Sequence, residues 1–172
     1  MLNKKKTIIA IVGPSGSGKT SLSMYMNEKY NVPFIASYTT RPMREGETNG
    51  IEHTFVSKAQ VPDRTVMLAY TKFGDYEYWS THDQVKDVPT TYTIDEKGLI
   101  EFKEKYADMY NIFSVYLKRD DSDVDQGRKD RDRDRTLLSD DWYDLIINNN
   151  YDTVDEFVKA ASKKIMMLYG HN

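Results

Sequence analysis

Residues 13–20 read Gly13-Pro14-Ser15-Gly16-Ser17-Gly18-Lys19-Thr20, and this stretch decides the fold. It matches a phosphate-binding loop, in which a glycine and four further residues precede Gly-Lys-Ser/Thr. The apolar, β-branched run at residues 7–12 predicts a buried strand before the loop. Apolar residues then recur at helical spacing, at Leu22, Tyr25, Met26 and Tyr30. We therefore expect a strand, a glycine-rich turn and a helix that begins near Lys19, the order that such a loop requires.

The residue types in this loop suit a chain of phosphate groups. Glycines let the backbone turn tightly and bring its N–H groups close to phosphate oxygens. The start of a helix adds unpaired N–H groups and a positive dipole end. Lys19 can reach the outer phosphates as a point charge, and the Thr20 hydroxyl can coordinate Mg²⁺. The loop predicts a nucleoside triphosphate as ligand, whereas the reaction has to be inferred from the rest of the chain.

Length and composition narrow the class of protein. The 172 residues suit one compact domain, and 39% hydrophobic with 30% charged residues is an ordinary balance for a soluble protein. A net charge of −3 argues against nucleic acid as the main partner. The absence of cysteine excludes disulfides and thiolate metal sites and fits a reducing compartment.

No targeting or membrane segment is predicted. No apolar run approaches the ~20 residues that a membrane helix needs. The basic residues 1–6 precede a short apolar run that leads into the phosphate loop, so we interpret this run as the first strand rather than a signal peptide. The expected location is the cytoplasm. The three histidines, His53, His82 and His171, are too scattered to suggest a metal cluster.

Residues 37–50 are rich in turn formers, hydroxyls and charges. Arg41 and Arg44 could clamp a second phosphate group through bidentate hydrogen bonds, or belong to a solvated charged loop. Residues 51–80 predict short strands, with a hairpin at Gly74-Asp75. The aromatic rings of this β-rich lobe could stack on a base or form the lobe's own core.

Alternating strands and helices resume after this lobe. We expect a strand at residues 90–94, a helix at 96–106 and a strand at 112–117. Asp95 follows the carboxyl end of the first of these strands, the side where ligands bind in open α/β sheets. It could hold a Mg²⁺-bound water, accept a hydrogen bond from a base, or cap the helix that follows it.

Residues 120–135 have the most unusual composition in the chain. An acidic run passes into alternating basic and acidic residues. On a helix, Arg128, Arg131 and Arg135 would share one face and could close over a triphosphate, held by Asp130 and Asp132. The alternative is a self-neutralising solvated helix. The position of the segment, at the ligand side of the sheet, favours the first interpretation.

The last part of the chain predicts one more strand and a closing helix. The strand covers residues 144–147, the turn 148–150, and a capping box 153–156. The inner face of the helix is expected to consist of Val154, Phe157, Val158, Ala161, Ile165 and Leu168.

In chain order the motifs are GPSGSGKT, SYTTRPMREGETNGIEHTFVS, YEYWS, TIDEKG, an Arg-rich segment and DLIINN. This order resembles the guanylate kinase family of nucleoside monophosphate kinases. The resemblance implies an α/β protein with the three-layer P-loop NTPase fold around a central parallel sheet. It implies a single guanylate kinase-like domain over residues 1–172. The core would comprise residues 1–35, 86–118 and 140–172, the β-rich monophosphate-binding lobe residues 36–85, and the short lid residues 119–139.

The resemblance also implies a reaction and its residues. A transferase of this kind moves the γ-phosphoryl group of ATP, with Mg²⁺, directly to a nucleoside monophosphate, here GMP or dGMP. ATP would bind to Gly13, Pro14, Ser15, Gly16, Ser17, Gly18, Lys19, Thr20 and Asn149, with Thr20 on the metal. The monophosphate would bind to Ser37, Arg41, Arg44, His53, Tyr78, Ser80 and Asp95. Catalysis would depend on Lys19, Arg41 and the lid arginines Arg128, Arg131 and Arg135.

Several positions depart from the family pattern. The glutamate that usually reads guanine falls near Leu68-Ala69, where there is no acid, so base selectivity should weaken by ~1–3 kcal/mol for each lost acceptor. His53 takes the place of a tyrosine, Trp79 of a glycine, and Thr93 of the first acid in an Asp-x-Asp pair. The alternatives are a P-loop kinase of another nucleotide or small phosphorylated metabolite, and a non-catalytic interaction module of this fold. The intact Lys19 and Thr20 favour a kinase over the module.

Overall fold

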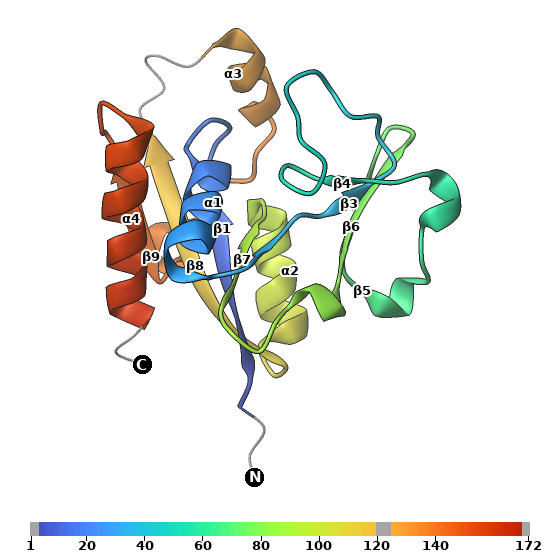
Figure 1. Ribbon diagram of the computed structural model, residues 1–172, viewed down its shortest axis with the longest axis horizontal. Helices are drawn as coiled ribbons and strands as arrows, with labels where there is room; N and C mark the ends of the chain where they lie inside the picture. Colours follow the sequence, from blue (N-terminus) through green and yellow to red (C-terminus); the bar gives the residue numbers. More distant parts are fainter. Residues whose placement is uncertain (1–3, 120–124, 170–172) are drawn as a thin grey trace. The chain divides into compact units, whose positions relative to one another are not determined.

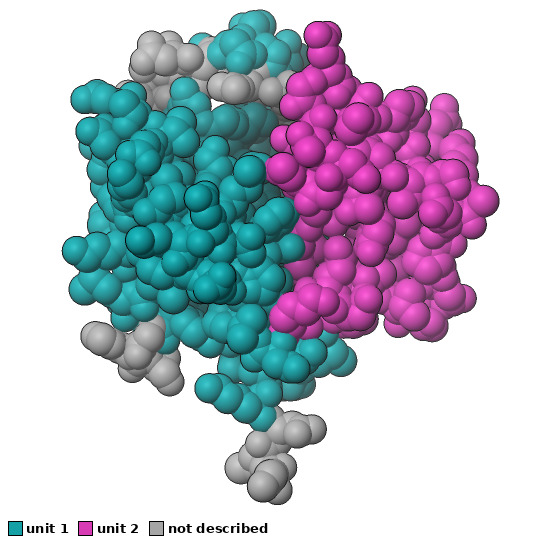
Figure 2. All heavy atoms as spheres, viewed as in Figure 1, with its two compact units in different colours: residues 1–34, 87–172 teal, residues 35–86 magenta. Residues whose placement is uncertain are grey.

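The computed structural model describes residues 4–119 and 125–169, which divide into two compact units. Unit 1 comprises residues 1–34 and 87–172, and unit 2 comprises residues 35–86. Figure 2 colours unit 1 teal and unit 2 magenta.

The centre of unit 1 is a five-stranded sheet with strand order β2-β7-β1-β8-β9 (Figure 1). Its strands are β1 (Lys6–Val12), β2 (Phe34–Ile35), β7 (Thr90–Thr93), β8 (Tyr110–Arg119) and β9 (Leu145–Asn149). β1 pairs in parallel with both β7 and β8, and β8 pairs in parallel with β9. The expected central parallel sheet is therefore confirmed. The carboxyl ends of these parallel strands lie at the same edge of the sheet, and this edge is where ligands bind in open α/β sheets.

Helices cover both faces of this sheet, because the apolar residues of β1 alternate between them. Ile9 and Ile11 pack in one core cluster with α1 (Lys19–Tyr30) and α4 (Val154–Tyr169). Ala10 and Val12 pack on the other face against Leu99 of α2 (Glu96–Tyr106). The result is the three-layer α/β fold that the sequence predicts.

The carboxyl-terminal part differs from the prediction in two places. β9 continues through Asn149, so the turn expected at residues 148–150 begins later. Val154 and Leu168 are 63% and 46% exposed, so neither belongs to the inner face of α4. They lie in the first and last turns of the helix, beyond the stretch that packs on the sheet. One half of the expected capping box is confirmed, since the N–H of Glu156 donates to the Thr153 hydroxyl. The Glu156 carboxylate accepts from that hydroxyl instead of from the backbone N–H of Thr153.

The predicted arginine-bearing helix is shorter than expected. α3 (Gln126–Asp132) ends three residues before Arg135, so the expectation that Arg128, Arg131 and Arg135 share one helical face is wrong. The N–H of Arg135 instead donates to the carbonyl of Asp132 in a turn. Residues 120–124 and the side chains of Arg128 and Arg131 lie outside the described part of the chain.

Unit 2 is built on a four-stranded sheet with order β4-β3-β6-β5. Its strands are β3 (Tyr38–Thr39), β4 (Thr54–Phe55), β5 (Met67–Phe73) and β6 (Tyr76–Thr81). The predicted hairpin at Gly74-Asp75 is confirmed, because Phe73 pairs with Tyr76 across the turn. Three single 3₁₀ turns flank the strands: η1 (Lys58–Gln60), η2 (Arg64–Val66) and η3 (His82–Gln84). A fourth, η4 (Asp140–Trp142), belongs to unit 1.

Helices that could cross a lipid bilayer were sought in residues 4–119 and 125–169, and none there is both long and apolar enough.

Candidate functional site

The phosphate loop connects β1 to α1, and its shape requires glycine at two positions. Gly18 has a φ of +97°, and a Cβ there would lie 2.5 Å from Cε1 of Phe157. A Cβ on Gly13 would lie 2.7 Å from the carbonyl oxygen of Leu117. A larger residue at either position would push the loop away from the sheet edge. Glycine is therefore needed at these two positions for close packing against the neighbouring residues, in addition to the close approach of the backbone to phosphate.

Lys19 curls back over the loop that precedes it. Its Nζ donates hydrogen bonds to the carbonyl oxygens of Gly13 and Pro14, both at 2.8 Å. These contacts keep the ammonium group in the concave side of the loop. A cation is thereby held where the outer phosphates of a nucleotide would need one.

The charge of Lys19 depends on its surroundings. Burial lowers the pKa of Lys19 from 10.5 to about 8, and the positive charge of Arg135 lowers it further, whereas Asp132 and Glu96 oppose the shift. The group therefore remains mainly protonated at pH 7. A desolvated cation interacts more strongly with phosphate than one in bulk water.

A carboxylate already occupies part of the loop. The N–H of Ser15 donates to both carboxylate oxygens of Asp132, at 3.1 and 3.0 Å. Asp132 was expected to pair with neighbouring arginines; its charge does act on Arg135, and its contact with the loop is an additional role. The loop thus binds an anion from the chain's own α3.

Thr20 meets the requirement for a metal-binding hydroxyl. It is the second residue of α1, it is exposed, and its hydroxyl makes no hydrogen bond to a described residue. No group of three or more His, Cys, Asp or Glu side chains among residues 4–119 and 125–169 could hold a metal ion. The donor set suits Mg²⁺ bound mainly through nucleotide phosphates.

Asn149 lies at the carboxyl end of β9 and braces the loop. Its Nδ2 donates to the carbonyl of Ser17 at 2.9 Å. A pocket of about 450 Å³ opens beside it, lined by Gly16, Gly18, Arg119, Asn149, Asn150, Tyr151, Asp152, Thr153, Val154 and Phe157. Because this pocket adjoins the loop glycines, it is suited to the base or sugar of a bound nucleotide.

Arg119 was missed by the sequence analysis. Its guanidinium donates to the carbonyl of Gly16 in the phosphate loop. Its position could have indicated this role, because Arg119 is the last residue of β8 and the carboxyl end of β8 lies next to that of β1.

Asp95 and its neighbour Glu96 have different surroundings. Asp95 is exposed and caps α2, accepting a hydrogen bond from the N–H of Gly98 at 2.7 Å. Glu96 is only 2% exposed and forms an ion pair with Arg135. Glu96 was also missed, because its partner Arg135 lies 39 residues away in the sequence.

Unit 2 brings together four of the residues predicted for the monophosphate. The Ser37 hydroxyl and Nδ1 of His53 are 3.0 Å apart, and the His53 ring meets the Tyr78 ring edge-on at 5.6 Å between centroids. Glu47 and, to a smaller extent, the Tyr78 hydroxyl raise the pKa of Arg41. Burial, followed by the charge of Arg41, lowers the pKa of His53. The ring is therefore mainly neutral at pH 7. A neutral ring can hydrogen-bond an anion but adds no positive charge to its binding site.

Arg41 is fixed by a carboxylate that the sequence analysis did not single out. Its two terminal nitrogens donate to both oxygens of Glu47, at 2.9 and 2.8 Å. The N–H of Arg44 donates to the same carboxylate at 2.7 Å. Hydrogen bonds from Arg41 are the largest cause that lowers the pKa of Glu47 from 4.5 to about 2. The side chain of Arg44 is exposed and makes no ion pair with a described residue.

The two faces of the unit 2 sheet differ. Ser80 lies two residues from Tyr78 on β6, so both side chains are on one face, and Ala69 is the register partner of Ser80. No acid therefore stands beside Ser80 at the position of the family glutamate.

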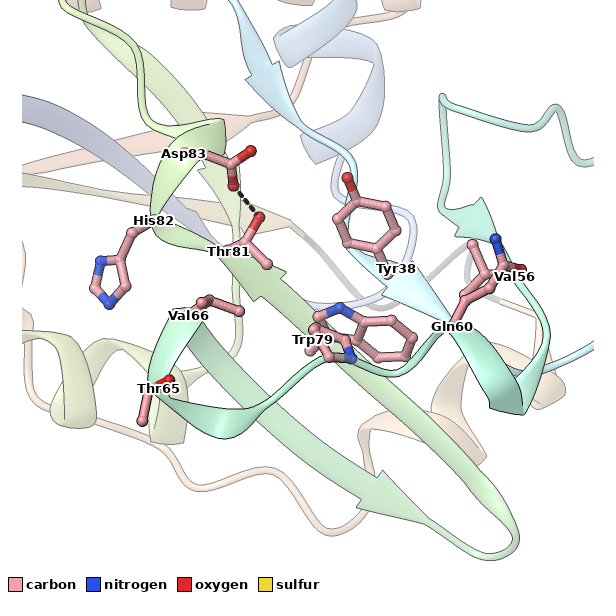
Figure 3. A pocket seen from close by; sticks show the side chains of 10 residues that line it. Tyr38, Val56, Gln60, Thr65, Val66, Trp79, Thr81, His82 and Asp83 are labelled. Atoms are coloured by element: carbon pink, nitrogen blue, oxygen red, sulfur yellow. Dashed lines mark hydrogen bonds between the residues drawn. The ribbon is translucent and has the colours of Figure 1, made fainter.

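Trp79 lies on the opposite face from Ser80. It stacks on its register partner Tyr38, with ring centroids 5.6 Å apart. Figure 3 shows both rings in a pocket of about 700 Å³, together with residues from η1, η2 and η3. The tryptophan that replaces the family glycine thus packs on the face opposite Tyr78 and Ser80, and Ser80 itself is fully buried.

Comparisons with known proteins agree with this architecture. A family model described as guanylate kinase matches residues 4–166. A guanylate kinase of Helicobacter hepaticus is 33% identical over 129 residues, which cover 70% of this chain and 64% of that protein. A guanylate kinase of Chlorobium chlorochromatii is 26% identical over 177 residues, which cover 90% of this chain and 93% of that one.

A solved structure shows the same fold. The crystal structure of guanylate kinase from Anaplasma phagocytophilum superposes with a TM-score of 0.64 at 18% identity, covering 95% of this chain and 87% of that one. The family match extends over nearly the whole described chain and includes both units. The chain therefore belongs to the guanylate kinase family of nucleoside monophosphate kinases.

Proposed function

We propose that this chain transfers the γ-phosphoryl group of ATP to a nucleoside monophosphate, with GMP or dGMP as the favoured acceptor. The observation that carries the proposal is the phosphate loop, with Lys19 held inside it and the Ser15 N–H donating to a carboxylate. A loop that binds a carboxylate through its backbone is preorganised for phosphate oxygens. The names of the relatives support guanine as the acceptor base.

The acceptor phosphate would bind in unit 2. Arg41 is fixed by Glu47 and interacts electrostatically with Tyr78, whose ring packs against His53. Preorganisation of this kind lowers the entropy cost of binding an anion. Arg44, with its exposed guanidinium, would complete the clamp. Ser80 would contact the base, and Asp95 remains a proposed base contact in addition to its helix cap.

The reaction would be a direct in-line displacement. An oxygen of the acceptor monophosphate attacks the γ-phosphorus, the bond to the β–γ bridging oxygen breaks, and ADP leaves. No side-chain nucleophile is needed, because the acceptor is already an anion. Lys19, Arg41 and Arg135 would stabilise the charge that develops, together with Arg128 and Arg131 of the lid.

Mg²⁺ fits this scheme as a ligand of ATP that Thr20 also holds. When bound, it supplies charge neutralisation on the phosphates. The residues of the chain orient the nucleotides and exclude water from the transferred group.

A coupled assay of ADP release tests the proposal. ATP and MgCl₂ are combined with GMP, dGMP, AMP, CMP, UMP or dTMP in turn. ADP release that depends on the monophosphate, and is greatest with GMP or dGMP, is the expected result. ADP release with none of the six would overturn it, and fastest release with a different base would overturn the acceptor assignment alone.

A further inference from the structure

Among the described residues of unit 1, Glu96 is the most deeply buried acid. It is the first residue of α2, it lies three residues after the end of the strand β7, and its side chain is 2% exposed. β7 pairs with β1, and the phosphate loop follows β1. A carboxylate so far removed from water is costly unless a positive group satisfies it.

Arg135 is that positive group. Its Nη2 donates to Oε1 of Glu96 and its Nε donates to Oε2 at 3.3 Å. The Arg135 side chain is only 14% exposed. The stacked rings of Tyr116 and Tyr143 lie near the pair, and the charge of Glu96 adds to the burial that raises the pKa of Tyr143 to about 12. The pair is thus held in a largely dry environment.

The pair also belongs to the surroundings of the phosphate loop. The charges of Arg135 and Glu96 both act on Lys19. Two of the five N–H donors of the Arg135 guanidinium are used on Glu96, which leaves three for other acceptors. A phosphate bound in the loop would be such an acceptor.

Among the described side chains, Asp132 and Arg135 tie the segment that ends in Arg135 to the rest of unit 1, and their two contacts differ in kind. Asp132 sits on the Ser15 N–H, a donor that nucleotide phosphates would need. A phosphate and this carboxylate would compete for the same donor and repel each other, so the contact is incompatible with a filled loop. The contact between Arg135 and Glu96 involves no group of the loop, so it can persist when nucleotide binds.

We propose that Glu96 is a positioning residue that anchors Arg135 beside the phosphate loop during phosphoryl transfer, while Asp132 gives way to the nucleotide. The inference rests on the proposed function and adds a residue outside the phosphate loop and the lid arginines. In this arrangement the guanidinium keeps one orientation instead of sampling many. Its remaining donors are ready when charge develops on the transferred group.

A double-mutant cycle tests this inference in the full-length chain. The variants are Glu96→Gln, Arg135→Ala and the double variant, with Glu101→Gln as the matched control on an exposed face of α2. For Glu96→Gln, kcat should fall about 10-fold while the KM values for ATP and monophosphate stay within about 2-fold. Arg135→Ala should lower kcat about 100-fold, and the double variant should fall no further than about 2-fold below it.

Two further variants guard against failure to fold. Glu96→Asp keeps the charge on a shorter stem, so its kcat should lie between those of wild type and Glu96→Gln. If Arg135→Ala does not fold because Glu96 is left unpaired, Arg135→Lys replaces it, since an ammonium group cannot bind both carboxylate oxygens as a fork. Each variant is checked by circular dichroism before its kinetics are measured.

The outcomes separate this inference from the proposed function. Unchanged kcat in Glu96→Gln, or losses that multiply in the double variant, would show that Glu96 does not act through Arg135 and would overturn the inference alone. A wild-type chain that phosphorylates no monophosphate would overturn the proposed function and this inference with it. A loss in Glu101→Gln equal to that in Glu96→Gln would also overturn the inference.

Discussion

The backbone N–H of Ser15 donates hydrogen bonds to both carboxylate oxygens of Asp132, with N···O distances of 3.1 and 3.0 Å. Ser15 lies in the phosphate loop, whereas Asp132 is the last residue of α3. The chain therefore places an internal anion where a nucleotide phosphate is expected to bind. ATP would have to displace that anion.

Replacing Asp132 should strengthen ATP binding. A hydrogen bond to a charged acceptor is worth about 1 kcal/mol more than one to a neutral acceptor, so Asp132→Asn should lower the KM for ATP by about 3- to 10-fold. The kcat should change little, because the side chain has left the loop by the time of transfer. Steady-state kinetics at pH 7 measure both constants. Asp134→Asn, at an exposed neighbour, is the control, and an unchanged or higher KM in Asp132→Asn would contradict the displacement.

Removing the charge of Lys19 should nearly abolish turnover without unfolding the chain. Nζ of Lys19 donates hydrogen bonds within the loop, to the carbonyls of Gly13 and Pro14. The substitution would remove the positive charge that stabilises the transferred phosphoryl group. Lys19→Met should lower kcat/KM by about 100- to 1,000-fold. Circular dichroism and thermal unfolding should match wild type. Lys29→Met, in the exposed last turn of α1, should keep full activity, and near-normal turnover in Lys19→Met would contradict the role given to Lys19.

The ion pair of Arg41 and Glu47 should make stability depend on pH. Hydrogen bonds from Arg41 hold the pKa of Glu47 at about 2 in the folded chain, compared with 4.5 ordinarily. A folded pKa below the unfolded one stabilises the fold at pH values above 4.5, and this stabilisation disappears as the pH falls from 4.5 toward 2. Glu47→Gln should therefore lower the free energy of unfolding by about 1–2 kcal/mol at pH 7 and by less at pH 3.

Urea denaturation at pH 7, 5, 4 and 3 checks this dependence. Glu45→Gln is the control, because Glu45 is an exposed neighbour of Arg44 that makes no hydrogen bond to a described residue. A difference between Glu47→Gln and wild type that stays constant over this range would show that the carboxylate charge is not what stabilises the loop.

Features encoded in short stretches were predictable from the sequence. The phosphate loop, its flanking strand and helix, the helix at 96–106 and the hairpin at Gly74-Asp75 all depend on local spacing and turn chemistry. Glu47 and Glu96 were missed, because their roles come from partners 6 and 39 residues away, which local patterns do not reveal. The end of α3 was also missed, because alternating charges continue past Asp132 without a helix-breaking residue. The contact of Asp132 with Ser15 was missed as well, because it spans 117 positions of the sequence.

Introducing a carboxylate at Ala69 should restore selectivity for guanine. Ala69 is the register partner of Ser80, so its side chain lies beside Ser80 on the face that carries Tyr78. A glutamate there could accept hydrogen bonds from the two N–H donors of the guanine edge, which adenine does not match. Each restored acceptor is worth ~1–3 kcal/mol, so Ala69→Glu should raise the ratio of kcat/KM for GMP to that for AMP by about 10-fold or more.

Competition assays with GMP and AMP in one mixture measure this ratio. Lys72→Glu is the control, because it places the same carboxylate on the opposite face of β5 at an exposed position. The ratio should stay at the wild-type value in Lys72→Glu. If Ala69→Glu left the ratio unchanged while the chain remained folded and active, the acceptor base would be bound somewhere other than beside Ser80, and the loss of the family glutamate would have no bearing on selectivity.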